Sequence, residues 1–92
     1  MSSARGKSLK AITRDIADGY VTINPIFLKP FEHLAIKELY QEISKTQTEV
    51  RGEKFPFNDI DGIRLRNLRL QRLYQALVVI KTFARERRIL LV

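Results

Sequence analysis

The feature that most constrains the fold of this 92-residue chain is a proline-free stretch from Ile60 to Glu86. Asn58 or Asp59 precedes it as a helix cap, and Asp61 in the first turn complements the positive end of a helix dipole. We therefore predict one helix of 27 residues, which is about 40 Å long at 1.5 Å per residue. Such a helix is long for so small a protein.

The apolar residues of this helix cover more of its circumference than one neighbouring helix can bury. At 100° per residue, the broad apolar face consists of Ile60, Ile63, Leu70, Leu73, Tyr74, Leu77, Val78 and Ala84. Four further apolar residues, Leu65, Leu68, Val79 and Phe83, fall largely outside that face. This distribution predicts burial on two sides, and a second copy of the chain is able to supply one of them.

Two more helices are expected upstream. Residues 8–18 place Leu9, Ile12 and Ile16 at helical spacing, with Ser8 as N-cap and Gly19 at the C-terminal end. A second helix is expected to begin near Phe31, directly after Pro30, and its weak helix formers at 44–48 predict fraying before residue 50.

The sequence therefore predicts a mainly α fold, a helical hairpin with a long C-terminal helix plus a short N-terminal helix. The β-branched and aromatic character of residues 20–23 is also compatible with a minor two-stranded element that pairs them with residues 89–92. The length allows one core, so we expect a flexible basic tail at 1–7 and a single helical domain at 8–92.

The net charge of +7 is unevenly distributed along the chain. Residues 1–14 carry four bases and no acid, residues 15–59 carry eight acids and five bases, and residues 60–92 carry eight bases and two acids. This asymmetry predicts either an anion-binding surface or an acidic helix packed beside a basic one.

Arginines of the third helix are the most suggestive functional residues. Arg66, Arg69 and Arg72 follow i, i+3 spacing with Arg64 nearby, and a guanidinium group suits phosphate and carboxylate. These four are the candidate anion or nucleic-acid surface. The alternative is that they pair with acids of the second helix, Glu38, Glu42 and Glu49.

Three other features do not support a chemical site, two because of their spacing and one because it lacks partner ligands. Gly6-Lys7-Ser8 lacks the upstream glycine of a phosphate-binding loop, and the acidic run before Gly62 lacks the closing acid of a calcium loop. His33 is the only histidine, and the chain has no cysteine with which it could bind zinc. We therefore expect no catalytic, cofactor or metal site.

A self-associating, non-enzymatic helical module for protein–protein interaction is accordingly the preferred functional prediction. A nucleic-acid-binding protein is the alternative, and a small helical enzyme acting on an anionic metabolite is the second. We expect a homodimer in the cytoplasm, with a further protein or a nucleic acid as partner and no association with membranes. The candidate interface consists of Ile63, Leu70, Tyr74, Leu77, Phe55 and Phe57.

Overall fold

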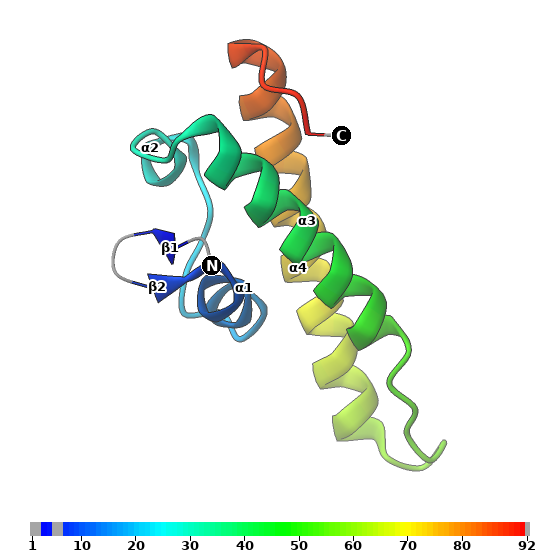
Figure 1. The fold of residues 1–92 in the computed structure, drawn as a ribbon. Helices are drawn as coiled ribbons and strands as arrows, with labels where there is room; N and C mark the ends of the chain where they lie inside the picture. The colour runs from blue at the N-terminus through cyan, green and yellow to red at the C-terminus, as the bar shows by residue number, and fades with distance from the viewer. Residues whose placement is uncertain (1–2, 5–6, 92) are drawn as a thin grey trace.

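The computed structural model describes residues 3–4 and 7–91, which form a hairpin of two long helices with a short helix packed across it (Figure 1). In chain order the elements are β1 (Ser3–Ala4), β2 (Lys7–Ser8), α1 (Leu9–Ala17), α2 (Pro25–Leu28), α3 (His33–Arg51) and α4 (Ile60–Arg87). The prediction of a mainly α fold with a helical hairpin is confirmed.

The hairpin consists of α3 and α4, which lie side by side and are joined by residues 52–59. Asp59 caps α4, because its Oδ1 accepts a 3.0 Å hydrogen bond from the amide of Gly62. Helix α3 continues to Arg51, so the expected fraying before residue 50 is wrong. Val50 packs against the core, and the Thr48 hydroxyl donates to the Ser44 carbonyl within the helix.

Helix α1 lies across the hairpin and begins and ends as its sequence indicates. The Ser8 hydroxyl accepts a hydrogen bond from the amide of Ala11 at 3.1 Å. Gly19 follows the helix with φ of +85°, a left-handed conformation that glycine adopts without steric cost. Contacts of α1 with both α3 and α4 make it the third side of the core.

Helix α2 was not expected from the sequence. Asn24 Oδ1 accepts a hydrogen bond from the amide of Phe27 at 2.8 Å, and Pro25 occupies the first turn. This single turn buries Leu28. Phe31 follows it into the core, and its ring centroid lies 5.4 Å from that of Phe27.

The predicted two-stranded element is wrong for the residues that the structure describes, since 20–23 and 89–91 are not strands; residue 92 lies outside them. Ile23 and Ile89 instead each bury a side chain in the helical core. A two-stranded ribbon is marginal by itself, so burial of single apolar side chains prevails. The observed antiparallel pair joins Ser3 to Ser8 and Ala4 to Lys7. The tail predicted at 1–7 lies partly outside the described residues.

The core occupies one half of the hairpin only. Buried apolar residues of the three main helices are Leu9, Ile12, Ile16, Ala17, Ile36, Leu39, Ile43, Leu73, Ala76, Leu77, Ile80, Phe83 and Ala84. Within α3 and α4, burial therefore begins at Ile36 and Leu73 and ends at Ile43 and Ala84.

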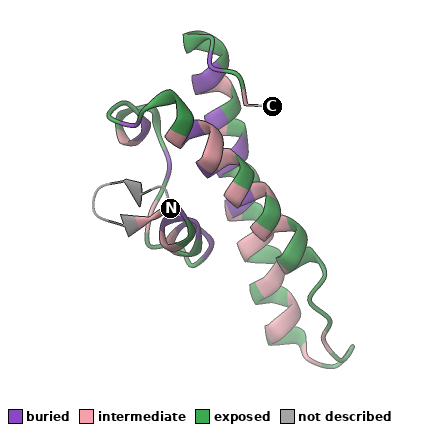
Figure 2. Ribbon diagram, in the orientation of Figure 1, coloured by how far each residue is buried: buried purple, intermediate pink, exposed green. Residues whose placement is uncertain are grey.

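The other half of the hairpin, residues 44–72, is here called the arm. No residue of the arm is buried, and Figure 2 shows this part of both helices only in the colours of intermediate and exposed residues. The longest dimension of the molecule is 45 Å, and the hairpin runs along it (Figure 1). In this part of the hairpin the two helices leave apolar side chains such as Leu65 and Leu68 exposed to solvent.

Candidate interaction surfaces on helix α4

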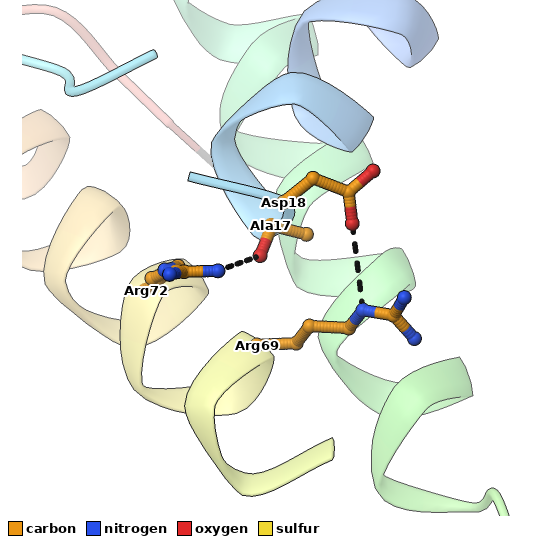
Figure 3. A network of polar contacts seen from close by, with 4 residues as sticks. All are labelled: Ala17, Asp18, Arg69 and Arg72. Carbon is orange, nitrogen blue, oxygen red and sulfur yellow. Dashed lines mark hydrogen bonds and ion pairs between the residues drawn. The ribbon is translucent and has the colours of Figure 1, made fainter. Parts of the chain in front are cut away.

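Two of the predicted arginines hold the C-terminal end of α1. Arg72 Nη1 donates a 3.1 Å hydrogen bond to the carbonyl oxygen of Ala17, and Arg69 Nε lies 3.4 Å from Asp18 Oδ1 (Figure 3). The last carbonyls of a helix lack partners within the helix and carry partial negative charge, so a guanidinium group stabilises this end. Both arginines therefore fix α1 on α4.

Gly19 leaves room for the Arg72 guanidinium beside this helix end. A Cβ atom at position 19 would lie 2.8 Å from Arg72 Cζ, which is closer than van der Waals contact permits. The left-handed backbone of Gly19 and the hydrogen bond of Arg72 are thus coupled.

Arg66 holds the loop between the long helices. Its Nη1 donates to the carbonyl oxygen of Glu53 at 3.0 Å, and its Cζ lies 5.9 Å from the centroid of the Phe55 ring. Arg66 Nη2 also approaches Asn67 Oδ1 at 3.4 Å. Phe55 is half-buried in this contact, whereas Phe57 is 94% exposed.

Arg64 differs from the other three arginines of the predicted surface. It is exposed and forms no hydrogen bond or ion pair with the described part of the chain. Three of the four arginines therefore make intramolecular contacts, and Arg64 faces solvent. The acid that pairs with Arg69 belongs to α1, not to the second long helix that the sequence suggested.

The six predicted interface residues also separate in the structure. Leu77 is buried in the core of its own chain, and Ile63, Leu70 and Phe55 are half-buried. Tyr74 and Phe57 remain exposed.

Exposed apolar residues outside that predicted set continue along α4. Leu65 is 46% exposed and Leu68 is 39% exposed. Both belong to the four apolar residues that fall largely outside the broad apolar face predicted for this helix. Together with Arg72, Gln75 and Val79 they follow a 3-4-3-4 spacing on one side of the helix. We call these five residues the α4 strip.

A groove adjoins the upper part of the α4 strip. It has a volume of about 620 Å³, and its wall includes Ile16, Val21, Ile23, Arg72, Gln75 and Val79. The groove is lined mainly by apolar side chains from α1, from the segment after it and from α4. The strip thus runs from the open arm into a walled depression.

Two simple kinds of site, a cluster of metal ligands and a membrane span, are not found among the described residues. Among them, no three histidine or acidic side chains gather as metal ligands, and none of their helices has the length and apolarity to cross a membrane. The sequence matches no protein family model, and comparisons with curated proteins and with solved structures find no significant match. The function is therefore argued from these surfaces.

Proposed function

We propose that this protein is a non-enzymatic assembly module that forms a homodimer through its arm and its α4 strip. The observation that carries the proposal is that no residue from 44 to 72 is buried, although the arm carries Leu65 and Leu68 on its surface. A second hairpin packed on this one completes a four-helix bundle and removes these leucines from water. The cytoplasmic location expected from the sequence is part of the same proposal.

A second copy in antiparallel orientation fits the strip. Leu65 and Val79 lie seven residues before and seven residues after Arg72, so a twofold axis near Arg72 places Leu65 opposite Val79 of the partner subunit. The Arg72 guanidinium is directed to α1, where it bonds the Ala17 carbonyl, and not outward to its symmetry mate.

Charge at the two ends of α4 favours the same orientation. Asp59 and Asp61 lie at its N-terminal end, whereas Arg85 and Arg87 lie in its last turn. Antiparallel pairing brings the acidic end of one α4 close to the basic end of the other, and it also opposes the two helix dipoles. Parallel pairing would join like charges at both ends.

The proposal is tested by sedimentation equilibrium of the purified chain at micromolar concentration. We expect a dimer for the wild type and a monomer for Leu65→Glu/Leu68→Glu, with the dissociation constant raised at least about 100-fold. Burial of a leucine contributes about 1.5–3 kcal/mol, and a buried unpaired carboxylate costs more.

Leu34→Glu is the matched control, because Leu34 is 62% exposed on α3 and lies outside the arm. This variant should remain a dimer with unchanged helical circular dichroism. A monomeric wild type, or equal dissociation of both variants, contradicts the proposal.

A further inference from the structure

A second surface of α4 is polar and basic. Arg64, Asn67, Gln71, Tyr74, Lys81 and Arg85 are all exposed and recur every three, four or seven residues. At 100° per residue they fall within an arc of about 100°. We call these six residues the α4 ridge. The strip lies roughly 110° around the helix from it, and the two surfaces meet only at Tyr74, which also lines the groove beside the strip.

Helix α4 contains no acidic residue between Gly62 and Arg85. Arg66, Arg69 and Arg72 in this segment are occupied by contacts within the chain. The other bases are ridge residues, Arg64, Lys81 and Arg85, and they form no hydrogen bond or ion pair with the described residues. Their positive charge is therefore available to a ligand.

We propose that the α4 ridge binds double-stranded nucleic acid. Arg64, Lys81 and Arg85 would contact backbone phosphates, whose binding to cations releases counterions. Asn67 and Gln71 carry amide groups that donate and accept hydrogen bonds, which suits both phosphates and base edges. From Arg64 to Arg85 the ridge spans about 31 Å, or roughly nine base pairs at 3.4 Å each.

Other anionic surfaces fit the ridge less well. A helix that lies on a membrane needs a broad apolar face opposite its basic one, whereas the exposed apolar residues on the ridge side are three separate side chains, Ile60, Tyr74 and Val78. An acidic polypeptide would satisfy the three charges, and its backbone would also bond the two amides, so the test below includes polyglutamate as a competitor. A duplex presents phosphates and base edges along the same line.

The proposed dimer brings two ridges to one side. A twofold axis relates the two antiparallel α4 helices, and it is perpendicular to the plane that contains them. The ridge of each helix points nearly along this axis. Rotation about the axis therefore leaves both ridges on the same side of that plane. Binding by one subunit does not depend on the dimer. In the dimer, two subunits would contact the same duplex and bind it more tightly.

Fluorescence anisotropy with labelled 20-base-pair DNA and RNA duplexes tests the proposal. We expect the wild type to bind at least one duplex at 50 mM salt, with affinity that falls steeply toward 200 mM. Arg64→Gln/Lys81→Gln/Arg85→Gln should weaken binding at least tenfold and reduce the salt slope by about 2.7 per subunit. The two duplexes distinguish DNA from RNA as the source of the phosphates.

Lys45→Gln/Arg51→Gln/Lys54→Gln is the control, because it removes the same charge from exposed residues outside the ridge. It should bind within about twofold of the wild type. Absence of duplex binding, equal losses in the two triple variants, or tighter binding to polyglutamate or phosphatidylserine vesicles would each overturn the proposal. Sedimentation separates this result from dimerisation, since the ridge variant should stay a dimer.

Discussion

Arg72 connects the first helix to the last through one hydrogen bond and one close approach. It is half-buried, and it satisfies the carbonyl of Ala17 while it lies against Gly19. The bond replaces a missing intrahelical partner at the end of α1. A residue predicted to bind a ligand therefore has a structural role.

A double-mutant cycle at positions 19 and 72 tests this role. Arg72→Ala should lower the free energy of unfolding by about 1–2 kcal/mol, because it leaves a helix-end carbonyl without a partner. Gly19→Ala should cost at least about 1 kcal/mol for its left-handed backbone alone. In the Arg72→Ala background its cost should shrink, since the close approach to the guanidinium is removed.

Urea denaturation at fixed protein concentration gives these free energies. Arg64→Ala serves as the control and should change stability by less than about 0.5 kcal/mol, because Arg64 is exposed and has no partner among the described residues. Additive effects at positions 19 and 72 would show that the two residues are not coupled.

Helix spacing explains why the predicted arginines face different neighbours in the structure. At i, i+3 spacing each successive side chain turns by 60°, so Arg66 and Arg72 point 120° apart. Each therefore meets a different neighbour, the loop at Glu53 or the end of α1 at Ala17. Those neighbours are distant in sequence from the arginines, so no local sequence pattern predicts these contacts.

Helix α4 has two halves of different character. From Leu73 to Ala84 one face of the helix is buried against α1 and α3, whereas from Ile60 to Arg72 it has no buried residue. The breadth of its apolar surface reflects this change of neighbours along its length. The sequence predicted that this helix is buried on two sides, and α1 of the same chain covers part of the second side.

Hydrogen exchange should detect the difference between the two halves. In Leu65→Glu/Leu68→Glu, which we expect to be monomeric, amides from Leu65 to Leu70 should exchange at least tenfold faster than in the wild-type dimer. Amides from Leu73 to Phe83 should change by less than about threefold, since the core is retained. Mass spectrometry of peptides from each half provides the measurement, and uniform acceleration over α4 would contradict the account.

Helices whose ends carry capping residues were predictable from the sequence. Ser8, Gly19 and Asp59 fixed the ends of helices through capping chemistry that acts within four residues. Helix α2 has a single turn, so no apolar period reveals it. The strand prediction failed because a β-branched side chain is buried as well among helices as in a sheet, and Ile23 is buried in the helical core.

At the scale of the whole molecule, the unequal distribution of the core is the main result. Sequence periodicity identified which residues of α4 are apolar, but only the position of α1 decides which of them are covered. Leu77 was predicted at an interface and lies in the core, while Leu65 and Leu68 lie on the open arm. The sequence therefore indicated that α4 has more apolar surface than its own chain covers, but it did not indicate where on the helix the uncovered surface lies.

The antiparallel dimer is most directly tested by cysteine cross-linking, for which a chain without cysteine is well suited. Leu65→Cys and Val79→Cys chains are mixed, allowed to exchange subunits and oxidised. Opposing positions of packed helices approach the Cα separation of about 4.4–6.8 Å that a disulfide needs. We predict that the disulfide between the two different variants forms in excess over both symmetric products. Dominance of the symmetric products, or no cross-linking of any kind, would contradict the account.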